Sequence, residues 1–356
     1  MNPYYDPSKP HHRPEGFQNS YQDFVPKSLA DVLRWKWNAA RNGLPPRPHA
    51  PTPQVAPDLA FLRANTVAGA AMVPAVTWIG HACVLVQMGG LTVLTDPMFS
   101  ERASPLSFMG PKRHVPPGVA RGDLPHIDLV LVSHNHYDHL DGPSVDHLAA
   151  QAGGPPLFVV PLGLLPWLRG RGIESGIELD WWQTHRIAAP KGDIDIMLCP
   201  AQHWSARGLA DRMTTLWGGF AVFAPDCHLF FAGDTGYSRD FHDLRERAAD
   251  RQRPETGGGF DLALLPIGAY EPRWFMTSQH VNAAEAVKIH QDVATKRSLG
   301  IHWGTFELTD EPLDEPPRSL AREALAAGLR EEEFFVLAIG ETRRIAPRVN
   351  ASPAAP

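Results

Sequence analysis

Residues 133–141 read SHNHYDHLD and bring three histidines and two aspartates into eight consecutive positions. They follow directly on the apolar run 127–132, IDLVLV, which is short, rich in branched side chains and typical of a buried strand. We therefore expect the segment to be the loop at the C-terminal end of that strand, where α/β sheets usually carry their chemistry. Imidazole and carboxylate are ligands that borderline divalent metals such as zinc prefer, so this loop is predicted to bind metal.

The spacing of the ligands within this loop indicates more than one metal ion. His134 and His136 are two positions apart, whereas Asp138 and His139 are adjacent. These four side chains do not all reach one tetrahedral ion comfortably, so we expect one pair on each of two ions. The alternative interpretation is a polar surface loop without metal.

Composition and charge limit the fold and the partners. The chain has 356 residues, of which 43% are hydrophobic, enough to bury a large core in one domain or in two smaller ones. Its net charge of −6 and isoelectric point near 6.3 argue against a nucleic-acid partner, which would need a basic surface. The oligomeric state stays open, with a homodimer among the expectations.

The cysteines and the first residues bear on the cellular compartment. Cys83, Cys199 and Cys227 lie far apart and form neither a zinc-finger pattern nor a disulfide framework, which favours a reducing, cytoplasmic setting. The first sixteen residues contain no apolar segment typical of a signal peptide, and no apolar stretch reaches the ~20 residues of a membrane span. We therefore expect a cytoplasmic protein that is soluble or peripheral at a membrane surface.

Residues 1–57 are predicted to be an arm outside the core, because eleven prolines in this stretch disfavour regular structure. One helix is expected from residue 28 to residue 42, with Ser28 as its N-cap and Gly43 as its C-terminal stop. Its apolar side chains form one stripe: Leu29, Val32, Leu33 and Trp37. This helix either packs on the domain with its charges solvated or contacts a membrane surface or a partner.

Later strands deliver further candidate ligands. The segments DIMLC (195–199), CHLFF (227–231) and KRSLGI (296–301) are predicted strands, followed closely by His203, Asp234 and His302 respectively. A carboxylate such as Asp234 can bridge two cations. The repeated delivery of ligands at strand ends therefore predicts a dinuclear site.

Two earlier residues are assigned to the shell around the ligands. The stretch 75–97 contains two or three strands with a turn at its paired glycines, and His81 and Asp96 lie at strand ends. Asp96 is expected to orient a metal-bound imidazole through its second nitrogen, whereas His81 is either structural or part of the site. The segment IELDWWQTH (177–185) is predicted to be one further strand.

The order HxHxDH, a later histidine, GDT and a final histidine after a strand resembles the metallo-β-lactamase superfamily. Longer blocks narrow the resemblance to the N-acyl-phosphatidylethanolamine-hydrolysing phospholipase D family. They are collinear over most of the chain and include LTDPMFSERASPLSFMGPKR, LVSHNHYDHLD, FVVPLGLLPWL, QHWSARG, FFAGDTGY, LPIGAYEPRWFM, QHVNAAEAVKIH and IHWGTF. The segment HHRPEGFQNSY (11–21) is also similar to the N-terminal region of that family, a region linked to membrane contact.

The resemblance implies an α/β fold, the metallo-β-lactamase αββα sandwich, in which two mixed sheets carry helices outside and the site lies at one edge between them. This catalytic domain would span residues 58–346. A Pro- and Ala-rich tail, 347–356, is expected to be disordered.

The resemblance also implies roles for individual residues. One zinc ion would be bound by His134, His136 and His203, and the other by Asp138, His139 and His302, with Asp234 between them. Tyr137, Gln279 and His280 would lie near the substrate phosphate. Asp138 and His280 are the candidates for moving the proton, on the basis of residue type and neighbourhood.

The function implied is that of a zinc-dependent phospholipase D-type phosphodiesterase, which hydrolyses the phospholipid N-acylphosphatidylethanolamine to N-acylethanolamine and phosphatidate. A water that bridges two cations loses a proton near neutral pH, and such a metal-bridging hydroxide would be the nucleophile. Two alternatives stay open: a related hydrolase of a lactone or a small phosphodiester, and a metal-holding membrane-binding protein without catalysis. The intact ligand set argues against the second.

Overall fold

Three consecutive strands open the first of two large sheets. The computed structural model describes residues 2–208 and 210–348. In it, β3 (Ala75–Gly80), β4 (Cys83–Met88) and β5 (Leu91–Thr95) form an antiparallel meander. Gly89 and Gly90 connect β4 to β5 with φ angles of 64° and 86°, which glycine adopts without strain in a two-residue hairpin turn.

Parallel strands extend this sheet on one side, and a late strand closes the other. The order is β16-β3-β4-β5-β6-β7-β8. The added strands are β6 (Leu129–Leu131), β7 (Leu157–Pro161) and β8 (Gly176–Leu179), all parallel, and β16 (Thr342–Arg344), antiparallel to β3. The helices whose side chains pack on this sheet are α2 (Leu59–Thr66), α3 (Gly142–Ala149) and α4 (Leu165–Arg169).

The second sheet also has seven strands, in the order β15-β14-β13-β12-β11-β10-β9. Its antiparallel part contains β9 (Thr184–Ile187), β10 (Ile194–Cys199), β11 (Gly219–Ala224) and β12 (Cys227–Phe231). Its parallel part continues through β13 (Leu262–Pro266), β14 (Ser298–Ile301) and β15 (Phe334–Phe335). Helices α5 (Asp240–Ala248), α7 (Ala283–Asp292) and α8 (Glu315–Ala326) contribute side chains to the same core.

Apart from helix α1 (Leu29–Asn42), the remaining elements are short. They are the two-stranded hairpin of β1 (His12–Arg13) and β2 (Gly16–Phe17), helix α6 (Arg273–Met276), and the 3-10 helices η1 (Gly69–Ala71), η2 (Arg121–Asp123), η3 (Ala249–Arg251) and η4 (Pro254–Thr256). In the described part of the chain, no helix is both long enough and apolar enough to cross a membrane.

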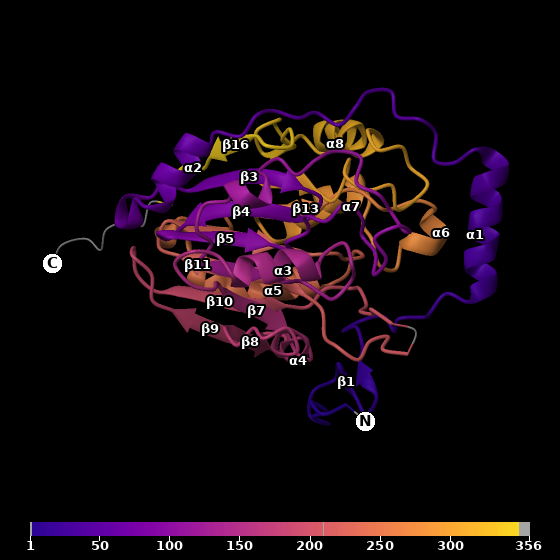
Figure 1. Ribbon diagram of the computed structural model, residues 1–356, viewed down its shortest axis with the longest axis horizontal. Helices are drawn as coiled ribbons and strands as arrows, with labels where there is room; N and C mark the ends of the chain where they lie inside the picture. The colour runs from indigo at the N-terminus through magenta and orange to yellow at the C-terminus, as the bar shows by residue number, and fades with distance from the viewer. Residues whose placement is uncertain (1, 209, 349–356) are drawn as a thin grey trace.

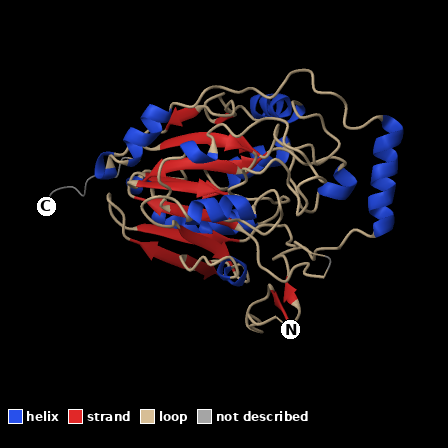
Figure 2. Ribbon diagram, viewed as in Figure 1, coloured by secondary structure: helices blue, strands red, loops and turns tan. Residues whose placement is uncertain are grey.

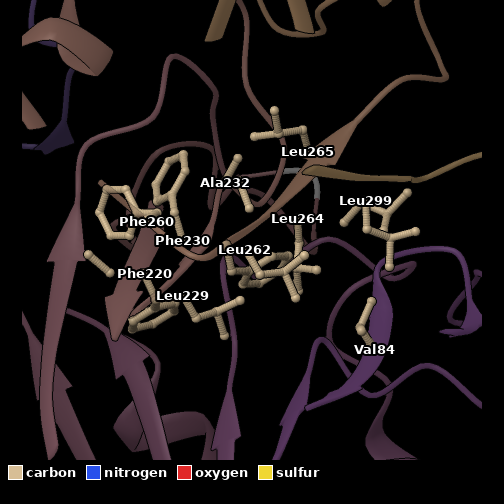
Figure 3. Close-up of a cluster of buried hydrophobic side chains, with 14 of the residues drawn as sticks. Val84, Phe220, Leu229, Phe230, Ala232, Phe260, Leu262, Leu264, Leu265 and Leu299 are labelled. Atoms are coloured by element: carbon tan, nitrogen blue, oxygen red, sulfur yellow. The ribbon is translucent and has the colours of Figure 1, made fainter. Parts of the chain in front are cut away.

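Alternation along the strands places the core between the two sheets. Val93 and Leu129 belong to the cluster shared with the second sheet, whereas their neighbours Leu94 and Val130 pack in the cluster with α2, α3 and α4. Figure 3 shows part of the shared core, where Val84 of β4 lies near residues of the other sheet. Because successive side chains of a strand point to opposite faces, one sheet face can pack on a sheet and the other on helices. The predicted αββα sandwich is confirmed (Figure 1).

The predicted N-terminal helix forms with the predicted ends. Helix α1 (Leu29–Asn42) begins after Ser28, whose side chain accepts a hydrogen bond from the amide of Asp31. It ends at Gly43, which has the left-handed φ of 62°. The helix stands at one end of the molecule beside α6 (Figure 1).

The face by which α1 packs differs from the predicted apolar stripe. The buried residues are Trp35 and Ala39, and the Trp35 indole donates to Asp310 Oδ2 at 2.8 Å and packs on Phe275. Of the predicted stripe, Val32 packs on the same cluster, whereas Leu29, Leu33 and Trp37 face solvent.

Three other segments differ from expectation. The stretch 177–185 is not one strand: β8 and β9 belong to different sheets, with a turn between them. The segment predicted as an arm is partly buried against the domain, with Phe17 and Asn19 inside. In the predicted tail, Arg348 is buried and donates to Asp261 at 2.8 Å, whereas 349–356 lie outside the described residues.

Candidate metal centre

The candidate ligands lie in loops that follow strands at one edge of the sandwich. Asp96 follows β5, the loop 133–139 follows β6, and Asp234 and His302 follow β12 and β14. His203 follows β10 in the same way. Figure 2 shows long loops gathered at the ends of the two sheets. Parallel strands bring their C-terminal ends to the same edge, so residues far apart in sequence converge there.

Three residues of this edge have a strained backbone. His81, Asp96 and His302 have φ angles of 55°, 32° and 64°, in a region that residues with a Cβ rarely adopt. The surrounding structure holds them: the His302 amide donates to the His81 carbonyl at 3.1 Å, and the His81 amide donates to Thr305 Oγ1 at 2.8 Å. Such strain is maintained at sites where side-chain direction matters.

The first ligand group consists of three imidazoles. His134 Nε2 lies 2.8 Å from His136 Nδ1, and His203 Nε2 lies 3.3 Å from the same atom. Burial holds the pKa of His134 well below its ordinary value and lowers the pKa of His136 to about 4 and that of His203 to about 3. All three rings are therefore neutral near pH 7, which is the form that binds metals.

The second ligand group mixes imidazole and carboxylate. His139 Nε2 lies 3.3 Å from His302 Nε2 and 3.4 Å from Asp138 Oδ2. Burial alone would lower the pKa of His302, but the carboxylates of Asp234 and Asp138 raise it to about 9, so a metal ion bound by this ring would displace a proton from it. His81 Nε2 is 3.0 Å from Asp138 Oδ2, so this histidine holds the carboxylate, and its ring is close enough to Asp138, His139 and His302 to join them in holding an ion.

Asp234 lies between the two groups. Its Oδ2 is 3.1 Å from His139 Nε2 and 3.9 Å from His203 Nε2, and its Oδ1 is 3.1 Å from His302 Nε2. His139 and His302 hold the pKa of this carboxyl well below its usual range, against the effect of burial. One carboxylate thus contacts ligands of both groups.

A further carboxylate orients a ligand ring. Asp96 is fully buried and accepts from His139 Nδ1 at 2.5 Å, while the Ser133 amide and hydroxyl donate to its two oxygens. This is the arrangement in which a second ring nitrogen sets the tautomer of a metal-binding histidine. The structure therefore brings together all seven residues proposed as ligands: His134, His136, Asp138, His139, His203, Asp234 and His302.

A family model described as the beta-lactamase superfamily domain matches residues 92–303, more than half of the chain. The chain belongs to the metallo-β-lactamase superfamily. The matched range includes the loop 133–141 and the ligands His203, Asp234 and His302.

Two relatives within the superfamily have informative names. The chain is 40% identical over 274 residues to N-acyl-phosphatidylethanolamine-hydrolyzing phospholipase D 1 of Caenorhabditis elegans, covering 74% of each protein. It is 37% identical over 257 residues to the mitochondrial N-acyl-phosphatidylethanolamine-hydrolyzing phospholipase D of Saccharomyces cerevisiae, covering 72% of this chain and 53% of that one. The resemblance stated from the motifs is confirmed.

A solved structure supports the superfamily fold. Igni18, a metallo hydrolase from Ignicoccus hospitalis, matches with a TM-score of 0.56 at 20% identity, over 76% of this chain and 97% of that one. This protein is an enzyme, a metal-dependent hydrolase. The assignment rests on its superfamily, on the names of its relatives and on its clustered histidines and aspartates.

The three predicted pocket residues have different surroundings. His280 is at the site, with its Nδ1 3.9 Å from Asp234 Oδ2 and its pKa lowered by burial to about 3. Gln279 contributes its main-chain carbonyl, to which His203 Nδ1 donates at 3.0 Å. The Tyr137 hydroxyl donates to the carbonyl of Arg207 at 3.0 Å, and its ring packs under that guanidinium.

Arg207 is a residue that the sequence reasoning missed. Its guanidinium donates to the carbonyls of Asn135 and Leu140 at 2.8 and 2.7 Å, and so braces the ligand loop from both ends. It also borders a cavity of about 510 Å³ together with Tyr137 and Trp167. The sequence block QHWSARG contains Arg207, but the sequence does not indicate which main-chain carbonyls an arginine side chain will bind.

Proposed function

We propose that this protein is a zinc-dependent phosphodiesterase of the phospholipase D type, which hydrolyses N-acylphosphatidylethanolamine to N-acylethanolamine and phosphatidate. The observation that carries the proposal is the pair of adjacent, buried ligand groups that share contacts with Asp234. The two relatives named for hydrolysing N-acyl-phosphatidylethanolamine support the choice of substrate.

The donor set fits zinc. One group offers three imidazole nitrogens, and the other offers the Asp138 carboxylate with the imidazoles of His81, His139 and His302. These are the nitrogen and oxygen ligands that Zn²⁺ takes in four-coordinate sites. The second ring nitrogens of His139 and His203 are held by Asp96 and by the carbonyl of Gln279. Ions bound there would supply Lewis-acid stabilisation of phosphoryl oxygens and a water of lowered pKa.

The residues of the chain supply the proton transfers. Water attacks phosphorus, the bond from phosphorus to the N-acylethanolamine oxygen breaks, and that oxygen leaves with a proton. We assign Asp138 to accept the proton of the attacking water. His280 is assigned to the leaving oxygen, because its ring lies beside Asp234 and its Nδ1 has no hydrogen-bond partner within the described chain. Burial lowers the pKa of this ring to about 3 in the free protein, and the negative phosphate of a bound substrate would raise it, so His280 takes up the proton that it donates when the substrate binds.

The substrate is tested by offering three compounds to the zinc-loaded protein in parallel: N-acylphosphatidylethanolamine, a lactone and a small nitrophenyl phosphodiester. We expect N-acylethanolamine and phosphatidate as the products of the lipid, identified by mass spectrometry. Turnover of the lactone or the small diester alone would favour the alternative hydrolases. Absence of turnover by protein that holds its metal would identify a non-catalytic metal-holding protein.

The bond that breaks makes a separate prediction. If water attacks phosphorus, hydrolysis in ¹⁸O-labelled water should place the label in phosphatidate, because the alcohol keeps its own oxygen. Mass spectra of both products measure this. Label in the N-acylethanolamine would instead indicate attack at carbon and would contradict the proposed reaction.

We also propose that helix α1 contacts the lipid surface. Its outer stripe is apolar, with Leu29, Leu33 and Trp37 exposed by 75%, 61% and 70%. Its basic residues Arg34 and Lys36 pack over the Trp274 and Trp35 rings. An exposed apolar stripe with flanking cations is typical of helices that lie in the interface of an anionic bilayer. The opposite side of the same helix packs on α6, which precedes Gln279 and His280, so the contact would lie at the end of the molecule that carries this segment.

Removing this stripe should weaken membrane binding. We expect Leu33→Ser combined with Trp37→Ser to reduce affinity for vesicles of phosphatidylcholine and phosphatidylglycerol about tenfold or more, because each buried side chain contributes about 1.5–3 kcal/mol. Co-sedimentation measures the binding, and hydrolysis of a short-chain soluble substrate should stay near wild type. Leu325→Ser, which removes an equally exposed leucine from α8, is the control. Equal vesicle binding by all three proteins would refute the contact.

A further inference from the structure

The N-terminal segment, residues 2–24, reaches the metal centre. The contacts fall on the stretch that contains His203: the Gln202 side chain donates to Gln22 Oε1 at 3.3 Å, and the Trp204 ring stacks on Phe24 with centroids 5.4 Å apart. Trp204 in turn packs edge-on against a ligand ring.

Asn19 makes the central contact of this segment. Its side chain is buried, at 6% exposure, and its Oδ1 accepts from the His203 main-chain amide at 3.1 Å. The same oxygen accepts from the indole of Trp217 at 3.2 Å. Both donors also reach the Ala201 carbonyl, which lies 3.1 Å from the His203 amide and 2.8 Å from the indole nitrogen, so Asn19 shares them with that carbonyl. Because Trp217 is a fully buried core residue, one amide oxygen joins the backbone of His203 to the core. The His203 ring is held separately, by the carbonyl of Gln279.

A buried carboxylate anchors the start of the segment. Asp180 accepts from His11 Nε2 at 2.7 Å, from His12 Nε2 at 3.0 Å and from Lys9 Nζ at 2.5 Å. The His11 ring also stacks on Trp181. With these donors and the Trp181 amide, the Asp180 oxygens have their hydrogen-bonding capacity taken up, so the cluster is an anchor between two parts of the chain.

A second anchor of the segment lies at Phe17, between Asn19 and the histidines that bind Asp180. The Phe17 amide donates to the carbonyl of Met213 at 2.9 Å, and the Phe17 ring is buried in the main core. A Cβ on Gly16 would lie 2.2 Å from the same Met213 oxygen. Only glycine permits this close approach. The segment is therefore held on both sides of the turn that leads to Asn19.

We propose that Asn19 is a positioning residue of the metal centre, and that the N-terminal segment sets the geometry of His203 through it. The inference rests on the proposed function, because Asn19 acts on metal through His203. Groups that orient a metal ligand without touching the ion typically change metal affinity about 10- to 100-fold when removed. Asn19→Leu removes this acceptor at similar size and leaves both donors with the Ala201 carbonyl alone, whereas Asn19→Asp keeps an oxygen for both donors.

The test measures zinc affinity by competition with a chromophoric chelator, alongside kcat and KM. Asn19→Leu should bind zinc about 10- to 100-fold more weakly and lose kcat more than KM. Asn19→Asp should stay within a few-fold of wild type. Gln18→Ala, the adjacent residue whose side chain bonds only to Asp23 in the described chain, is the matched control and should be unchanged. The melting temperature of the zinc-free proteins reports any loss of folding stability separately.

Each result decides the inference. Equal zinc affinity for Asn19→Leu and wild type would overturn it. Weaker zinc binding by Asn19→Asp than by Asn19→Leu would also overturn it, because it would indicate that Asn19 acts through packing alone. If Asn19→Leu does not fold, Asn19→Ser is measured in the same way, because its shorter hydroxyl does not reach the His203 amide. Wild-type protein that binds no zinc would instead contradict the proposed function.

Discussion

Replacing Asp234 with asparagine should remove most of the hydrolysis and part of the bound metal. The carboxylate contacts ligands of both groups, at 3.1 Å from His139 and 3.9 Å from His203, so its charge serves both sites. Metal-based stabilisation of a transition state contributes several kcal/mol, and each 1.36 kcal/mol is tenfold, so we expect kcat/KM to fall on the order of 10³-fold. Elemental analysis should show fewer zinc ions per chain.

Asp240→Asn is the matched control for this variant. Asp240 is also a buried aspartate, six residues further along the chain, but it accepts from the Ser238 hydroxyl and belongs to neither ligand group. Its substitution should leave the metal content unchanged. Full metal content in Asp234→Asn would contradict a shared carboxylate. Wild-type protein with one ion or none, under zinc-replete conditions, would contradict the dinuclear centre.

Replacing His280 with alanine should slow hydrolysis of the natural lipid by about 10²–10⁴-fold, the usual contribution of a general acid. The departing alkoxide of N-acylethanolamine is a poor leaving group and needs a proton as it forms. A diester with a nitrophenol leaving group needs none, so its hydrolysis should fall much less. Steady-state kinetics on both substrates, with His242→Ala on the exposed side of α5 as control, measure the difference.

Two outcomes would change the role of His280. Equal losses on both substrates would contradict protonation of the leaving group. Loss of zinc from His280→Ala would make it a ligand, because its Nδ1, His203 and Asp234 are close enough to hold an ion. The metal content of the variant is therefore measured before its kinetics.

Several features of the protein follow from local sequence alone. Helix α1 begins after Ser28 and ends at Gly43, and the paired glycines 89 and 90 form the expected turn. Caps and turns are set by residues within a few positions of one another, so a local pattern is sufficient to predict them. Alternating and continuous apolar runs likewise identify most of the strands.

The sequence was also informative about the site, for a topological reason. Ligand-type residues follow four separate strands, and the ends of parallel strands meet at one edge of a sheet. His203, Asp234 and His302 could therefore be grouped with the loop 133–141 before any distance was known. The structure places them within a few ångströms of one another.

Other features depend on contacts between distant parts of the chain. The segment 177–185 divides between two sheets, because its two halves pair with different partners, β7 and β10. Asn19 meets His203, 184 positions away, and Arg207 braces the ligand loop through main-chain carbonyls. Main-chain acceptors are alike at every residue, so sequence carries no mark of such partners.

The orientation of α1 shows the same division. Its apolar stripe and its ends were determined by its own sequence, but which side is buried was decided by Asp310 and Phe275, which bind Trp35. A helix with apolar residues on two sides can pack by either one. Local sequence determined the elements and the order in which the ligands occur, whereas tertiary packing decided which faces are covered and which residues hold the ligands, because burial depends on neighbours that the chain brings together only when folded.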